Sequence, residues 1–136
     1  MKRESWPADL VSLPLIQEHV ETLVAASGIG QKRVVQVSIA LEEVVMNIIN
    51  HAYAKTLKGN ISIEFEDHPR QVVIRIIDGG IPFDPLGVPE PDIGLDIMAR
   101  PIGGLGIVMI RKFMDGVTYE RSHDKNILGL VINKIE

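Results

Sequence analysis

ALEEVVMNIINHAY, residues 40–53, is the stretch that says most about the fold and function of this chain. With the residues before it, the stretch repeats apolar side chains at the spacing of an amphipathic helix. This spacing predicts a helix over residues 31–54, about 36 Å long. Its apolar side is formed by Val34, Val37, Leu41, Val45, Ile48 and Ala52.

The opposite side of this predicted helix is polar. At 100° per residue, the side chains that share roughly a third of its circumference are Glu43, Asn47, Asn50 and His51. Burying a carboxylate and amides beside an apolar core costs free energy unless they have partners, which a ligand or a metal would supply. Taken alone, however, a Glu and an Asn on a helix are more often simply solvated.

The rest of the chain predicts further elements on either side of that helix. Asp9 is a candidate cap for a first helix over residues 9–26. Period-two alternation over residues 61–66 and the nearly continuous apolar run 71–78 predict two strands joined as a hairpin. A third helix is expected over residues 104–114. A last pair of strands is expected over 117–121 and 127–134, with a turn at 122–126.

Residues 79–106 are rich in Gly and Pro, which predicts a long and therefore functional loop with at most a short helical turn near residues 92–98. The element order is then helix, helix, strand, strand, loop, helix, strand, strand. Consecutive strands favour antiparallel pairing. The expected fold is therefore α+β, a two-layer α/β sandwich with a mainly antiparallel sheet and helices on one face.

Composition limits the function further. The chain has 136 residues, which suits a single domain over 1–136, and its core is aliphatic because 46% of residues are hydrophobic but 4% aromatic. A net charge of −4 with scattered Lys and Arg argues against direct nucleic-acid binding. The absence of cysteine excludes disulfides and thiolate chemistry. Without a signal-peptide pattern or an apolar run of about 18 residues, we expect a cytoplasmic protein without a membrane span.

The motif IIDGGIPFDP, residues 76–85, follows a predicted buried strand. Its carboxylate, Asp78, accepts hydrogen bonds when ionised, which suits an amino group such as that of adenine. Gly80 would allow a flat ligand to approach the backbone closely. In isolation, however, Asp-Gly-Gly is more often a plain β-turn.

The motif RPIGGLGIVMIRKFMD, residues 100–115, places Gly103, Gly104 and Gly106 at the start of an apolar helix. Free amide groups at a helix N-terminus bind phosphate. The motif is not a P-loop, and it does not follow a strand as a dinucleotide fingerprint requires.

In this order, the three motifs resemble the N-box, G1-box and G2-box of the GHKL (histidine kinase-like) ATPases. Within that family the chain is most similar to the anti-sigma-factor serine/threonine-protein kinase branch. The similarity extends over nearly the whole chain, through A-L-E-E-x-x-x-N-x-I-x-H-A-Y, D-G-G-x-P-F-D-P and G-G-L-G-I-x-x-I-R-K-F-M-D. It implies a Bergerat-type ATP-binding fold, with ATP and Mg²⁺ as cofactors.

The resemblance also implies roles for individual residues. Asn47 would hold Mg²⁺ against the phosphates, and Glu43 would be the catalytic general base. Asp78 would recognise adenine. The other positions implied to bind the nucleotide are Gly80 beneath the base, Phe83 in the same motif, Arg100 as a clamp on the γ-phosphate, and Gly104 and Gly106 around the triphosphate.

Two further features follow from the resemblance. Residues 85–102 would form the ATP lid. Members of the family often carry a Gly-Thr pair on the last hairpin, whereas here Gly129 is followed by Leu130. We therefore expect altered nucleotide affinity rather than loss of binding.

The leading hypothesis is an ATP-dependent protein serine/threonine kinase that is also an anti-sigma factor, with a sigma factor and a STAS-domain anti-sigma antagonist as partners. The resemblance also implies a homodimer. An alternative is a nucleotide-binding module that sequesters its partner without phosphotransfer. The third reading, an ATPase fragment of a sensor histidine kinase, would need a phosphoacceptor such as His19 and is the least favoured.

Overall fold

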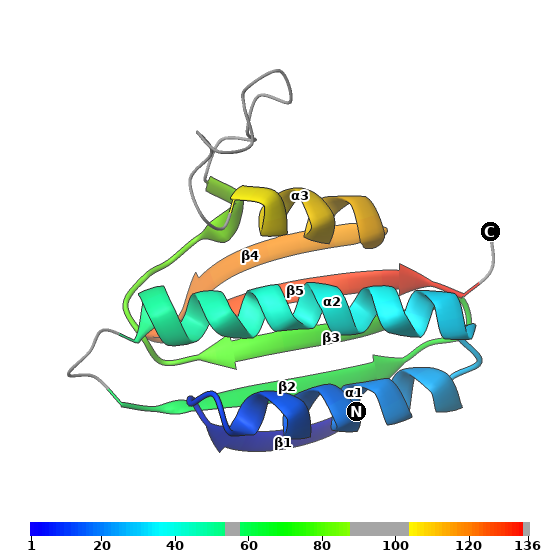
Figure 1. Ribbon diagram of the computed structural model, residues 1–136, viewed down its shortest axis with the longest axis horizontal. Coiled ribbons are helices and arrows are strands. Elements are labelled where there is room, and N and C mark those ends of the chain that lie inside the picture. The colour runs from blue at the N-terminus through cyan, green and yellow to red at the C-terminus, as the bar shows by residue number, and fades with distance from the viewer. Residues whose placement is uncertain (54–57, 88–103, 135–136) are drawn as a thin grey trace.

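The computed structural model describes residues 1–53, 58–87 and 104–134, with the backbone alone at 87 and 104–106. A five-stranded sheet forms one layer and three α-helices lie side by side on one of its faces (Figure 1). The strand order is β1-β2-β3-β5-β4, and every neighbouring pair is antiparallel. This arrangement confirms the predicted α+β sandwich.

The strands are β1 (Lys2–Pro7), β2 (Asn60–Asp67), β3 (Gln71–Asp78), β4 (Gly116–Ser122) and β5 (Lys125–Asn133). The α-helices are α1 (Ser12–Ala26), α2 (Gln31–Asn47) and α3 (Gly104–Phe113). Two short helical segments complete the described chain, the π-turn η1 (Ile48–Ala52) and the 3₁₀ turn η2 (Pro85–Gly87).

The edge strand β1 is absent from the sequence-based prediction. It pairs with β2, with Trp6 opposite Ile61. Its other side chains are exposed, and Trp6 alone is half-buried. A strand of this kind lacks the apolar alternation by which strands are recognised in sequence, and only its pairing partner identifies it.

Two helix boundaries also differ from the prediction. Helix α1 begins at Ser12 rather than at Asp9, with Val11 at its N-cap position. The Asp9 carboxylate accepts hydrogen bonds from the Ser12 amide at 3.1 Å and hydroxyl at 3.0 Å, so Asp9 caps the turn that leads into the helix. Helix α2 ends at Asn47, after which the chain widens into η1. Such π-turns often occur at functional sites.

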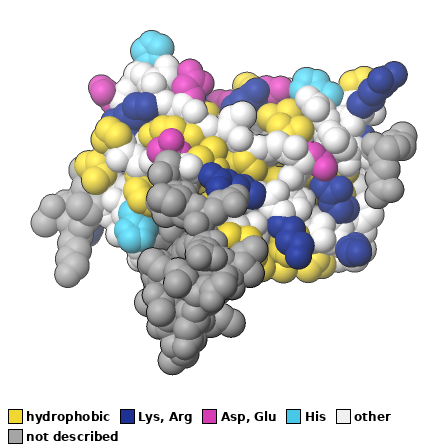
Figure 2. Space-filling view, turned by 90° about the horizontal axis from the view of Figure 1, so that it is seen from above, with side chains coloured by type: hydrophobic (Ala, Val, Ile, Leu, Met, Phe, Trp, Pro, Cys, Tyr) yellow, Lys and Arg dark blue, Asp and Glu magenta, His cyan; other side chains and the backbone are white. Residues whose placement is uncertain are grey.

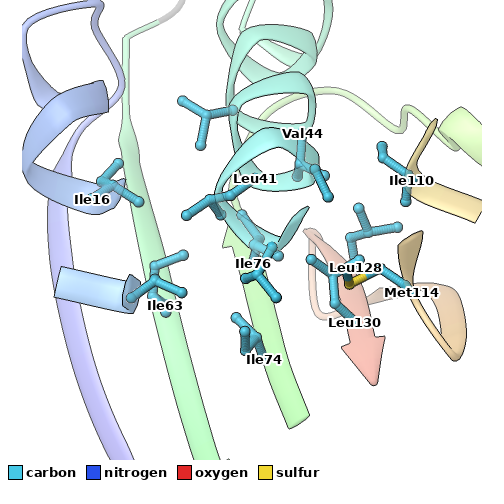
Figure 3. Close-up of a cluster of buried hydrophobic side chains, with 14 of the residues drawn as sticks. Ile16, Leu41, Val44, Ile63, Ile74, Ile76, Ile110, Met114, Leu128 and Leu130 are labelled. Atoms are coloured by element: carbon cyan, nitrogen blue, oxygen red, sulfur yellow. The ribbon is translucent and has the colours of Figure 1, made fainter. Parts of the chain in front are cut away.

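The core lies between α2 and the sheet. Leu41 and Val44 project from α2 toward Ile74, Ile76 and Leu128 on the two central strands (Figure 3). The predicted apolar side of α2 and η1 is buried at each of its six positions. Because α2 lies over the centre of the sheet, its half-buried flank comes close to the ends of β3 and β5.

On the face shown in Figure 2, Lys and Arg side chains are interspersed with hydrophobic and acidic ones. Within residues 1–53, 58–87 and 104–134, no helix is both long enough and apolar enough to cross a membrane.

Candidate functional site

Glu43 and Asn47 lie one helical turn apart near the end of α2, both half-buried. Burial raises the pKa of Glu43, and the neighbouring Asn47 amide offsets part of that rise. A carboxylate that is half-buried, with its pKa moved toward neutrality, is suited to accept a proton.

The π-turn η1 redirects the other polar residues of the predicted helical face. Asn50 and His51 are exposed. The His51 ring stacks on Phe83, with ring centroids 5.1 Å apart and an interplanar angle of 18°. The sequence-predicted positions His51 and Phe83 are therefore in contact, and they join η1 to the segment after β3.

Asp78 is the last residue of β3 and is 3% exposed. Its Oδ1 accepts hydrogen bonds from the Gly80 amide and from Asn126 Nδ2, both at 2.9 Å. Burial raises the pKa of Asp78, while these two hydrogen bonds and the positive charges of Arg121 and Lys125 lower it in part. The strand alternation points this carboxylate to the helix-covered face, because Asp78 has the same parity as Ile74 and Ile76.

Asn126 lines the cavity between α2 and the sheet, and the sequence does not predict this position, because its pattern places residues 122–126 in a turn. It lies opposite Asp78 in the β3–β5 register and is also 3% exposed. A signal was present in the alternation of β5, where Asn126 shares its parity with the buried Leu128 and Leu130. A polar residue in phase with core positions is buried and needs partners.

The backbone after Asp78 packs tightly against η1. A Cβ at Gly80 would lie 2.3 Å from the Ala52 carbonyl oxygen, so a side chain at that position requires the backbone to move. The Tyr53 hydroxyl accepts a hydrogen bond from the Gly79 amide at 2.7 Å and donates one to the Asn60 carbonyl at 2.7 Å. The need for glycine at position 80 thus comes, in this structure, from contact with the protein itself.

A small cavity lies between α2 and the ends of β3 and β5. Its polar lining comes from Asn47, Asp78, Tyr119 and Asn126, and Phe83 closes part of it. The volume is about 20 Å³, which is room for about one water molecule. A purine ring fits there only if lining side chains move, and Phe83 lies on the segment without regular structure between β3 and η2.

The third motif is described in part. Helix α3 begins at Gly104, as predicted, and Gly104 and Gly106 lie in its first turn. Arg100, Gly103 and most of the predicted lid lie outside the described residues, as does the predicted turn at 92–98. Arg111 on α3 donates a hydrogen bond to the Leu86 carbonyl at 2.9 Å and so connects α3 with η2.

The Gly129–Leu130 step lies away from this cavity. Leu130 is fully buried in the core, and Gly129 pairs with Arg75 and Thr118. At the end of β5 that approaches the cavity, the residue opposite Asp78 is Asn126. Asn126, and not Gly129 or Leu130, lines the cavity. The expected change in nucleotide affinity stays a prediction.

This chain is similar in sequence to a known family and to several named proteins. The family described as the histidine kinase-like ATPase domain matches residues 6–132. The serine-protein kinase RsbW of Listeria monocytogenes is 27% identical over 99 residues, which cover 70% of this chain and 63% of that protein. The chain thus spans less than two thirds of that relative.

Other relatives are covered more fully. RsbW of Bacillus thuringiensis is 26% identical over 134 residues, covering 96% of this chain and 82% of the relative. The serine/threonine-protein kinase BtrW of Bordetella bronchiseptica is 27% identical over 93 residues, which cover 68% of this chain and 66% of that protein. A crystal structure of the RsbU and RsbW domains of a Mycobacterium tuberculosis protein superposes with a TM-score of 0.62 at 12% identity, over 97% of this chain and 32% of that one, which shows a shared fold.

Proposed function

Because this chain belongs to the histidine kinase-like ATPase family, we propose that it is an ATP-dependent serine/threonine-protein kinase. The observation that carries the proposal is the Glu43–Asn47 pair, a half-buried carboxylate and amide beside the cavity that Asp78 lines. Relatives named serine-protein kinase support the same activity.

In the proposed reaction, Glu43 is the general base. A serine or threonine hydroxyl of the substrate protein attacks the γ-phosphorus, its proton passes to Glu43, and the bond to the β-phosphate oxygen breaks to release ADP. The raised pKa of Glu43, caused by burial, makes the carboxylate a better proton acceptor than an exposed one. Each turnover thus moves one phosphoryl group from ATP to the hydroxyl oxygen and one proton from that hydroxyl to Glu43.

Asn47 fits a magnesium site of the kind found with nucleotides. Mg²⁺ takes oxygen ligands and usually binds through one or two protein groups together with substrate phosphates. The amide oxygen of Asn47 supplies one such group beside Glu43. When bound, the ion neutralises charge on the phosphates.

The remaining nucleotide contacts are proposed on the same basis. Asp78 accepts a hydrogen bond from the amino group of adenine, and Phe83 and Gly80 lie at the base. The N-terminal amides of α3, at Gly104 and Gly106, are suited to phosphate, and Arg100 is proposed as the γ-phosphate clamp.

The proposed biological role is that of an anti-sigma factor in the cytoplasm. Its substrate would be a STAS-domain anti-sigma antagonist, phosphorylated on Ser or Thr, and its second partner a sigma factor. Pairing of two copies as a homodimer is part of the same proposal.

A phosphotransfer assay with a STAS-domain antagonist and radiolabelled ATP tests the activity. Glu43→Gln should lower the rate about 10²- to 10⁴-fold, the usual contribution of a general base. Glu42→Gln is the matched control, because Glu42 is the neighbouring exposed carboxylate and its loss should leave the rate within about threefold of wild type.

Each outcome has a defined meaning. If Glu43→Gln transfers phosphate at the wild-type rate, Glu43 is not the base. If wild type binds Mg²⁺–ATP but transfers nothing, the chain is a nucleotide-binding module that sequesters its partner. If wild type does not bind ATP, the kinase proposal is wrong.

A further inference from the structure

Asn126 is held by four hydrogen bonds within the protein. Its Nδ2 donates to Asp78 Oδ1 at 2.9 Å and to the Ile81 carbonyl at 2.8 Å. Its Oδ1 accepts from the Phe83 amide at 3.2 Å and from the Tyr119 hydroxyl. A side-chain amide offers two donors and two acceptor positions, so all four are used. The amide therefore has one orientation and keeps no polar group free for a ligand.

The hydrogen bonds of Asn126 orient the Asp78 carboxylate. Oδ1 of Asp78 already accepts from Asn126 and from the Gly80 amide. Two donors on one oxygen fix the plane of the carboxylate and leave Oδ2 for a hydrogen-bond donor on a ligand. Donors that point at a carboxylate also favour its charged form over the neutral one.

Other groups around Asp78 act differently. Several charged or titratable side chains lie near it. They are Tyr53 directly after η1, Tyr119 and Arg121 from β4, Lys125 from β5, and Arg3 and Lys58, which line the hollow on its other side. Arg121 donates its hydrogen bond to the Gly80 carbonyl. Among the described residues, Asn126 is the side chain that donates to Asp78 itself.

We propose that Asn126 is the positioning residue that determines base specificity, because it holds Asp78 as an oriented, acceptor-only carboxylate. A site of this kind takes a purine that presents an amino group at Asp78 and disfavours one that presents an oxo group. This inference rests on the proposed ATP-binding function and extends it to a residue outside the three motifs. Asn126 also ties Ile81 and Phe83 to β5, so it fixes the base-binding segment as well.

The test uses Asn126→Asp, which keeps the shape of the side chain. In its protonated form, the new carboxyl group donates to Asp78 Oδ1 as the amide does. In its ionised form, it sets two carboxylates against each other. The ATP affinity of Asn126→Asp should therefore rise as pH falls from neutral to mildly acidic, and at neutral pH it should be weaker than wild type by about tenfold or more.

The ATP affinity of wild type should instead fall as pH falls, because protonation of Asp78 removes the hydrogen-bond acceptor. Calorimetric titrations of both proteins across this pH range, with ATP and with ITP, measure the effect. ITP carries an oxo group where ATP carries the amino group, so the preference for ATP over ITP should also fall in the variant. Gln31→Glu is the matched control, because Gln31 is exposed at the first position of α2, at the opposite end of that helix from Asn47, and the charge change is the same.

A second measurement does not need nucleotide. The ¹³C shifts of Asp78 and of the new carboxyl group, followed by NMR over pH, should show that in Asn126→Asp the pair takes up one shared proton at Asp78 Oδ1, at a higher pH than Asp78 titrates in wild type. Tyr119→Phe, which removes one donor to Asn126 and leaves the bond to Asp78, should give a smaller change in the same direction.

The inference is wrong if Asp78 titrates alike in wild type and Asn126→Asp, or if the ATP affinities of both follow pH with the same sign. If wild type binds no ATP, the proposed function fails, and the NMR titration still decides whether Asn126 controls Asp78. A loss of affinity that is equal at every pH, with an unchanged preference for ATP over ITP, would show a purely structural role and would also overturn the inference.

Discussion

Two carboxylate–amide pairs line or adjoin the same cavity, and they are built in different ways. Glu43 and Asn47 are four residues apart on one helix and half-buried. Asp78 and Asn126 are 48 residues apart on two strands and each is 3% exposed. The first pair lies at the edge of solvent, whereas the second belongs to a saturated buried network.

The difference indicates how each pair responds to a ligand. A half-buried pair exchanges its contacts with water for a metal or a substrate at little cost, since water and ligand compete on similar terms. A buried, saturated pair keeps its geometry, because an unsatisfied polar group there costs about 1–3 kcal/mol. The Asp78–Asn126 pair is thus held in place, whereas the proposed catalytic end takes its final arrangement with the ligand.

The largest effect in this comparison is expected from Asp78→Asn. The new amide oxygen still accepts from Asn126 and Gly80, so its NH₂ group faces the ligand and opposes the adenine amino group. ATP affinity should fall about 10- to 100-fold, the cost of a hydrogen bond to a charged group.

The same variant should leave the fold at least as stable as wild type, because it removes a buried charge. Isothermal calorimetry and urea unfolding measure the two effects. An unchanged ATP affinity would show that Asp78 does not contact the base.

Gly80→Ala should act on the buried end through packing. Its Cβ would lie 2.3 Å from the Ala52 carbonyl, so the segment after β3 must shift, at a cost of about 1–3 kcal/mol in the free energy of unfolding. Gly30→Ala is the control, because nothing lies within 4 Å of a Cβ there. Urea unfolding of the two variants should separate them, and equal midpoints would contradict the tight contact.

Asn47→Ala should weaken ATP binding by about tenfold, or 1.4 kcal/mol, when Mg²⁺ is present. The loss should be smaller in EDTA, because the proposed role of Asn47 is to hold the ion. Calorimetric titration with ATP, once with Mg²⁺ and once in EDTA, measures both losses of affinity. Equal losses with and without Mg²⁺ would assign Asn47 to the nucleotide rather than to the metal.

The smallest effects are expected from pH. Glu43 must be ionised to accept a proton, and burial raises its pKa, so the phosphotransfer rate should fall with acid at a higher pH than an exposed carboxylate would allow. The pH profile of kcat measures this fall in rate on the acid side. A fall that begins only in the pH range of an ordinary exposed carboxyl group would contradict the effect of burial.

The buried carboxylate Asp78 should make the free energy of unfolding depend on pH in the opposite direction, so that acid stabilises the fold. A carboxylate whose pKa is raised on folding destabilises the fold as pH rises through the window between its ordinary and its raised value. The free energy of unfolding of wild type should therefore fall relative to Asp78→Asn across this window. Subtracting the two urea-unfolding profiles isolates Asp78 from the surface carboxylates, and a difference that does not vary with pH would refute the prediction.

The sequence alone determined the features that depend on neighbours along the chain. Helical spacing brought Glu43 and Asn47 together, because residues four apart on a helix share a face. The alternation of β2 and β5 and the apolar run of β3 predicted the hairpins, and the motif order identified the family that the comparison confirmed. The roles assigned to individual site residues stay predictions.

Tertiary structure decided the features that depend on pairing between distant segments. The contact of Asp78 with Asn126 exists because β3 and β5 pair in one register, and a shift of one residue would turn both side chains to the other face. Strand β1 exists because β2 offers it an edge, and η1 widens the end of α2 where the segment after β3 packs against it. Helical neighbours are fixed by local geometry, whereas strand neighbours are chosen by the packing of the whole sheet, and this is why one carboxylate–amide pair was visible in the sequence and the other was not.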